Sequence, residues 1–185
     1  MESLAYNPNM LATVVFAIAL QTAPAQATKS DAVPSADLVV QRAQVAAKAA
    51  GKNVMVLFHA SWCGWCHKLD DYMALPAVKP LFAKSYEIVH LTVLENDAHK
   101  ADENAGGEAW LDKLGGKNQG IPYFAMLSPA GKVLADSRAG GKQNVGFPAA
   151  PQEVAHFLDM LKKTSKLNVA ELKTVETELL SAGKK

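Results

Sequence analysis

The sequence predicts an α/β domain built on a central mixed sheet of about four strands flanked by helices. Three observations support this fold class. A short apolar run, Asn53–His59, lies between two helical patterns, which is typical of a strand that enters a parallel pair. Two later strand-like runs are separated by a short turn segment, which favours an antiparallel hairpin. The chain then ends with amphipathic helical patterns that can cover a sheet.

Residues 1–27 are expected to be a signal peptide. Met10–Leu20 is an uncharged apolar run, short for a membrane span, and Ala25-Gln26-Ala27 offers a small-residue cleavage site. Residues 1–9 contain Glu2 but no Lys or Arg, unlike a normal export signal, so Met10 is an alternative start. An uncleaved amphiphilic N-terminus is the alternative interpretation. No cysteine lies near the cleavage site, which excludes a lipid anchor there.

The rest of the chain is expected to consist of a linker, residues 28–34, and one domain, residues 35–185, long enough to bury a core. Removing residues 1–27 takes away Glu2 and no base, which raises the formal charge from +1 to +2. This charge is too close to neutral to indicate nucleic acid or an anionic membrane surface as a partner.

The domain begins with a predicted helix that Ser35 can cap and that ends at Gly51. The run Asn53–His59 is nearly all apolar, as expected for a strand covered on both faces. Side chains alternate along a strand, so one face carries Met55, Leu57 and His59 and the other carries Val54, Val56 and Phe58.

The remaining elements follow from spacing and from turn residues. Further helices are predicted from Cys66 to Pro76, over Ala77–Lys84, over Glu108–Leu114, over Gln152–Lys163 and from Asn168 to Gly183. Further strands are predicted over Tyr86–Leu94, Pro122–Ser128 and Val133–Ser137, the last two joined by the turn Ser128–Lys132. The segments 95–120 and 139–151 are otherwise expected to be loops. Acids and a histidine in the first of these loops do not follow a metal-binding spacing, so no metal site is expected: Asp97, His99, Asp102 and Glu103.

Cys63 and Cys66 are the only two cysteines in the chain, and they stand two residues apart at the start of a predicted helix. Unpaired N–H groups at a helix N-terminus stabilise a thiolate, so Cys63 is the expected nucleophile. Cys66, about one turn further on, can attack a mixed disulfide on Cys63 and release the product. A disulfide between them closes a very short loop and stabilises the fold little, which indicates a catalytic rather than a structural disulfide.

The segment F-H-A-S-W-C-G-W-C-H-K, Phe58–Lys68, resembles the active-site segment of the thioredoxin superfamily. G-I-P at Gly120–Pro122 resembles its second landmark, a loop with a cis-proline. The resemblance covers about Lys52 to Gly140, and the helical stretch with Pro76 and Pro80 is most similar to exported thioredoxin-like proteins, including the periplasmic C-terminal domain of the bacterial transmembrane disulfide reductase. It implies a thioredoxin-like fold, a redox-active Cys63–Cys66 disulfide and protein disulfide oxidoreductase activity without a cofactor.

The resemblance also implies a substrate groove made of Trp62, Gly64, Trp65, Ile121 and Pro122. A cis bond before Pro122 turns the backbone of Ile121 towards the cysteines, so that a peptide can hydrogen-bond along it like an added strand. A trans proline at a strand start is the alternative. Trp65 is the better contact candidate, because Trp62 is expected to be mostly buried.

Two histidines are candidates for tuning the cysteines. Thioredoxins carry a buried acid six residues before the first cysteine, but this chain has Leu57 there. His59, on the same strand face, can replace the acid as proton acceptor; a packed histidine without a proton role is the alternative. His67, when positive at the helix start, can lower the pKa of Cys63.

A rival interpretation uses the same cysteines. The run Cys63 to His67 also matches C-x-x-C-H, the attachment motif of c-type haem, with His67 as an axial ligand and Met126 as a candidate second ligand. A cytochrome needs neither the preceding strand, nor Trp62, nor the G-I-P segment, so these features favour the oxidoreductase. A redox-inert binding module is a third interpretation, which the presence of both cysteines disfavours.

The sequence therefore predicts a periplasmic or secreted thiol-disulfide oxidoreductase that acts on protein thiols or disulfides. Ile121 before the proline resembles the reducing members, which favours a reductase fed by a membrane-embedded thiol donor. The pair Gly64-Trp65 does not fix the reduction potential, so an oxidant or isomerase that forms disulfides is the alternative. Misoxidised proteins and apocytochrome cysteines are both candidate substrates.

Overall fold

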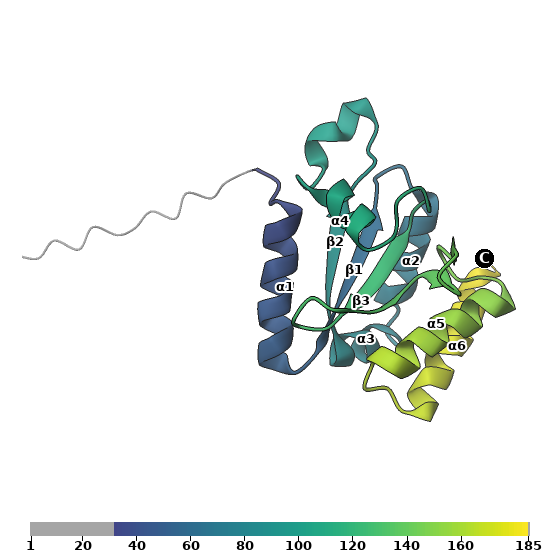
Figure 1. Cartoon of the computed structure of the whole chain (residues 1–185). Helices are drawn as coiled ribbons and strands as arrows, with labels where there is room; N and C mark the ends of the chain where they lie inside the picture. The colour runs from purple at the N-terminus through teal and green to yellow at the C-terminus, as the bar shows by residue number, and fades with distance from the viewer. Residues whose placement is uncertain (1–31, 185) are drawn as a thin grey trace, which may run out of the picture. The chain divides into compact units, whose positions relative to one another are not determined.

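A computed structural model describes residues 32–184, and Figure 1 shows a sheet with helices on both of its faces. The expected signal peptide, residues 1–27, lies outside the described residues, as do residues 28–31 of the expected linker. Within the described part of the chain, no helix is both long enough and apolar enough to span a membrane.

The sheet has four strands in the order β2-β1-β3-β4. The strands are β1 (Asn53–His59), β2 (Tyr86–Thr92), β3 (Tyr123–Leu127) and β4 (Val133–Asp136). β1 runs parallel to β2 and antiparallel to β3, which in turn pairs antiparallel with β4. The prediction of a mixed sheet with a closing hairpin is confirmed.

Within residues 32–184, six α-helices surround the sheet: α1 (Ala36–Ala50), α2 (Gly64–Ala74), α3 (Lys79–Ser85), α4 (Gly107–Lys113), α5 (Pro151–Thr164) and α6 (Val169–Gly183). All six lie where the sequence predicts a helix, and Ser35 and Asn168 cap α1 and α6 as expected. The predicted loops contain further short elements, the 3-10 helix η1 (Asp97–Asp102) and the paired strands β5 (Arg138–Ala139) and β6 (Gln143–Asn144). These pieces are too short for a periodic pattern to reveal them.

The two faces of β1 enter two separate hydrophobic clusters, as its alternation predicts. Met55 and Leu57 pack into a cluster formed mainly with α2, α3, α5 and α6. Val54, Val56 and Phe58 pack into a second cluster with α1 and α4. All five side chains are buried, so β1 is covered on both faces.

Aromatic contacts hold the C-terminal helices onto the first of these clusters. Phe157 of α5 is fully buried, and its ring centroid lies 5.6 Å from that of Phe124 and 6.2 Å from that of Phe82. Tyr72 of α2 donates a hydrogen bond of 3.0 Å to the backbone oxygen of Val175 in α6. The helix that carries the second cysteine is therefore tied directly to the last helix of the chain.

We expect Phe157→Ala to lower the free energy of unfolding by about 3–5 kcal/mol, because it removes a buried ring and leaves a cavity between β3 and α3. Urea denaturation followed by circular dichroism measures this loss. Val169→Ala is the control, since Val169 is 85% exposed and its change should stay within about 0.5 kcal/mol. Equal stabilities for the two variants would contradict the described packing of α5.

Candidate active site

Cys63 and Cys66 are joined in a disulfide at the N-terminus of α2, with their Cα atoms 5.2 Å apart. Cys63 is the N-cap residue, and its Sγ accepts a hydrogen bond of 3.2 Å from the backbone N–H of Cys66. Cys63 is 4% exposed and Cys66 only 1% exposed. The first sulfur therefore receives the N–H donor that the sequence prediction invokes to stabilise a thiolate.

The loop from Gly120 to Pro122 lies beside this disulfide. The peptide bond between Ile121 and Pro122 is cis, as the prediction requires, and Ile121 packs against Ala60 and both cysteines. Trp65, Ile121 and Pro122 line one groove of about 440 Å³ together with the segment 144–147. Trp62 and Gly64 are not among the residues that line this groove.

The opposite wall of the groove is aromatic. Trp65 is 57% exposed and stacks on Phe147, with ring centroids 6.1 Å apart. The Nζ atom of Lys68 lies 5.0 Å from the Trp65 ring and 5.1 Å from the Phe147 ring. Phe147 lies in the predicted 139–151 loop, and no local pattern marks it as part of a site.

Asn144 of β6 fastens the proline loop to the rest of the domain. Its Nδ2 donates to the backbone oxygens of Gln119, Gly120 and Pro122 at 3.3, 3.1 and 2.9 Å. Its Oδ1 accepts from Ser137 Oγ at 2.7 Å. Sequence reasoning missed this residue, because the three carbonyls that it binds lie more than twenty positions earlier in the chain.

Ile121 itself is left out of this network. Within residues 32–184, neither its backbone N–H nor its C=O has a hydrogen-bond partner, although the carbonyls of Gly120 and Pro122 on either side are both bonded to Asn144. A free donor and acceptor at the edge of a groove are what an added peptide strand requires.

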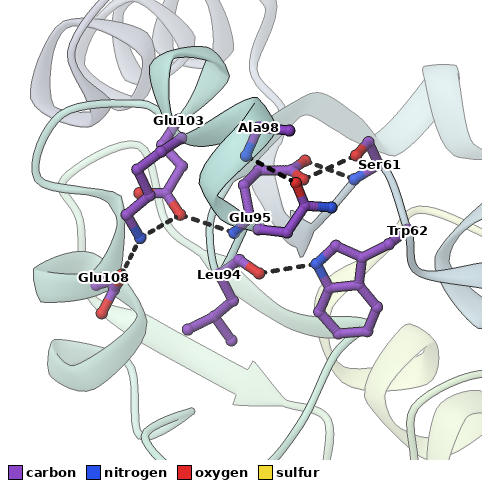
Figure 2. A network of polar contacts seen from close by, with 9 residues as sticks. Ser61, Trp62, Leu94, Glu95, Ala98, Glu103 and Glu108 are labelled. Atoms are coloured by element: carbon purple, nitrogen blue, oxygen red, sulfur yellow. Dashed lines mark hydrogen bonds and ion pairs between the residues drawn. The ribbon is translucent and has the colours of Figure 1, made fainter.

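A polar network anchors the turn that precedes Cys63 (Figure 2). The Glu95 carboxylate accepts hydrogen bonds from both the backbone N–H and the hydroxyl of Ser61, and it is only 7% exposed. Glu103 in turn accepts from the backbone N–H of Glu95 at 2.8 Å. Desolvation raises the pKa of Glu95, but the hydrogen bonds from Ser61 outweigh it and hold that pKa below its usual value. Glu95 is therefore a carboxylate near the active site that sequence reasoning missed.

The expectation that Trp62 is mostly buried is wrong. Trp62 is 55% exposed, almost as much as Trp65. Its Nε1–H donates to the backbone oxygen of Leu94 at 2.8 Å, so one edge of the indole is fixed while the rest faces outwards (Figure 2). The indole is hydrogen-bonded to the loop after β2 instead of being buried in the core.

The two candidate histidines have different surroundings. Nε2–H of His67 donates to the backbone oxygen of Ser61 at 2.8 Å, which adds a further tie to the active-site turn. His59 lies in a separate hollow of about 620 Å³ with Asp70 and His90, away from the groove at Pro122. Its Nε2 lies 3.2 Å from Thr92 Oγ1, and its ring centroid lies 5.0 Å from that of His90. Burial lowers the pKa of His59, and His90 lowers it further.

The positions of the candidate haem-binding residues do not support the haem interpretation. Both cysteine sulfurs are bonded to each other, and Met126 is fully buried in the middle of β3. His67 is engaged with the carbonyl of Ser61. Among the described residues, no group of three or more His, Cys, Asp or Glu side chains is arranged to hold a metal ion.

We expect His59 to make stability depend on pH between about pH 7 and pH 5. The folded protein holds the His59 pKa below the 6.5 of an unfolded chain, so the unfolded state takes up the proton first as pH falls. The free energy of unfolding should therefore decrease over this range and do so less steeply in His59→Asn. Burial raises the pKa of Asp70, but the hydrogen bond from His90 outweighs burial and lowers that pKa overall. The stability that the Asp70 carboxylate contributes is therefore lost only at lower pH.

Urea denaturation at pH 7, 6 and 5 measures these slopes. Val45→Asn is the control, since Val45 is 67% exposed and carries no titratable group, so its slope should match that of the unmodified protein. A slope in His59→Asn that equals the slope in Val45→Asn would refute the assignment.

Comparison with known proteins gives the family. Residues 38–129 match a family model described as thioredoxin-like. Similar solved structures include a disulphide isomerase from Xylella fastidiosa Temecula1, with 25% identity over 61% of this chain and 78% of that chain and a TM-score of 0.46. A DsbH oxidoreductase shares 20% identity over 69% of this chain and 82% of that chain, with a TM-score of 0.47. A thioredoxin from Thermus thermophilus shares 23% identity over 65% and 79% of the two chains, with a TM-score of 0.43.

The matched region runs from α1 through β3 and contains the disulfide, the turn before it and the proline loop. Residues 38–129 form a thioredoxin-like domain, and this domain carries a CXXC disulfide, the active group of thiol-disulfide oxidoreductases.

Proposed function

We propose that this protein reduces disulfides of exported proteins. In the first step the Cys63 thiolate attacks one sulfur of a substrate disulfide, and the other substrate sulfur leaves as a thiolate. In the second step Cys66, after losing its proton, attacks Cys63 Sγ and displaces the substrate's remaining thiolate. The substrate gains two electrons and ends as a dithiol, and the enzyme ends with its Cys63–Cys66 disulfide.

The hydrogen bond from the Cys66 N–H to Cys63 Sγ carries the assignment of the two roles. A donor at a helix N-terminus stabilises negative charge on the sulfur that it reaches, and that sulfur belongs to Cys63. The nearly complete burial of Cys66 fits a thiol that attacks only within the protein.

The substrate is proposed to bind as an extended segment along Ile121. The unpaired N–H and C=O of Ile121 supply the backbone contacts, and Asn144 holds the loop in place on both sides of that residue. Trp65 and Phe147 offer an apolar wall on the same groove. This arrangement suits a polypeptide better than a small disulfide, which has no backbone to pair.

The proposed direction of electron flow and the proposed cellular location both rest on the sequence. The apolar N-terminal segment with its Ala25-Gln26-Ala27 site supports export to the periplasm or beyond. An oxidised enzyme in such a compartment needs a source of electrons, and a membrane-embedded thiol donor is the proposed one. No nucleic acid, lipid anchor or cofactor is part of the proposal.

We expect Cys66→Ser to accumulate a mixed disulfide with a protein substrate, because the attack by Cys63 proceeds but the resolving thiol is missing. Intact mass spectrometry after incubation with oxidised, unfolded ribonuclease A detects the adduct, which dithiothreitol should release. Cys63→Ser should form little or no adduct. A stronger adduct with Cys63→Ser than with Cys66→Ser would reverse the two roles.

A glutathione redox titration of the mature protein tests the direction. We expect a two-electron potential of about −270 mV, the range of reducing thioredoxins, read by alkylation of Cys63 and Cys66. A potential of about −120 mV would instead assign the protein as an oxidant that forms disulfides.

A further inference from the structure

Leu94, two residues after the end of β2, has a backbone conformation that its residue type disfavours. Its φ is 57°, in the left-handed region, and Asn118 is the only other non-glycine residue with positive φ among residues 32–184. Asparagine adopts this region readily, whereas a bulky apolar residue does so at a cost. A leucine at this position therefore needs an explanation beyond backbone geometry.

Hydrogen bonds hold Leu94 and the residues on both sides of it. The backbone oxygen of Leu94 accepts the Trp62 Nε1–H at 2.8 Å. The residue before it, Val93, donates to the backbone oxygen of His59 at 2.9 Å, and the residue after it, Glu95, is held by Ser61 and Glu103. Strained residues persist where neighbours fix them in this way, often at functional sites.

Packing in the core does not explain why an apolar side chain stands at position 94. It is 39% exposed and belongs to none of the hydrophobic clusters of the described residues. In Figure 2 the side chains of Leu94 and Trp62 extend in the same general direction, away from the Glu95 carboxylate. Leu94 and the half-exposed Trp62, which directly precedes Cys63 in the chain, are joined by the bond from Nε1–H to the Leu94 carbonyl, and we call this apolar pair the Leu94–Trp62 surface.

Leu94 also lines a hollow of about 420 Å³ against α4 that reaches Gly120. Gly120 lines the groove at Pro122 as well, so the two hollows meet at the proline loop. The charges at the rim of the α4 hollow are paired, Asp112 with Lys117 at 2.9 Å and Glu108 with Lys100 at 3.4 Å. An uncharged side chain is thus the best match for this second hollow.

We propose that Leu94 is a specificity-determining residue for protein substrates. An extended substrate segment that pairs with Ile121 crosses the proline loop, and one of its apolar side chains packs on the Leu94–Trp62 surface. This inference rests on the proposed function, since it adds a second contact to the same bound segment. The occupant is a disulfide-bearing polypeptide with an apolar residue near its cysteine.

The test compares a protein disulfide with a small one. Dithiothreitol supplies the electrons, and insulin and 2-hydroxyethyl disulfide are the two substrates. For Leu94→Asn we expect the ratio of kcat/KM for insulin to kcat/KM for the small disulfide to fall about 5- to 10-fold, mainly through KM, because one apolar contact is lost. Asparagine tolerates the left-handed backbone, so the midpoint of thermal unfolding should stay the same or rise.

Two further variants define the outcome. Leu38→Asn is the matched control, since Leu38 on α1 is 37% exposed and lies in neither hollow, and its ratio should match the unmodified protein. Leu94→Met keeps an apolar side chain and should restore most of the ratio. An unchanged ratio in Leu94→Asn would overturn the role of Leu94 alone. Failure of the unmodified protein to reduce even 2-hydroxyethyl disulfide would overturn the proposed function and this inference with it.

Discussion

The burial of β1 on both faces is the constraint on which the active site depends. β1 pairs with β2 on one side and β3 on the other, and its side chains enter both hydrophobic clusters. A one-residue slip would exchange the two faces, so the register of β1 is strongly specified. The end of the strand at His59 is fixed as a result, and Cys63 follows only four residues later as the cap of α2.

The loops around the disulfide are positioned by polar side chains rather than by the core. Glu95 holds Ser61 in the turn before Cys63, and Asn144 holds the proline loop on the other side of the disulfide. Both anchors come from segments that the chain reaches only after β2 or β4. The sheet thus determines where the cysteines lie, whereas these two residues determine the shape of the surface that a substrate meets.

The division between local and distant contacts also explains how much the sequence could predict. β1, the capped helices and the two cysteines are encoded by neighbouring residues, and their predicted positions agree with the structure. The bonds of Glu95 to Ser61 join residues 34 positions apart, so no local pattern contains them. The exposure of Trp62 depends on the loop at Leu94, 32 positions away, which is why the expectation of a buried indole failed. The pair β5 and β6 is too short to show alternation.

The charges around Cys63 act in opposite directions on its thiolate. The N–H of Cys66 reaches Sγ directly and favours the charged form. The Glu95 carboxylate, bonded to a residue two positions before Cys63, disfavours a second negative charge nearby. Since stabilising the reduced form of a CXXC pair makes it a stronger oxidant, a carboxylate that opposes the thiolate makes the pair more reducing. The proposed reducing direction therefore agrees with the position of Glu95, whose carboxylate also holds the turn before Cys63.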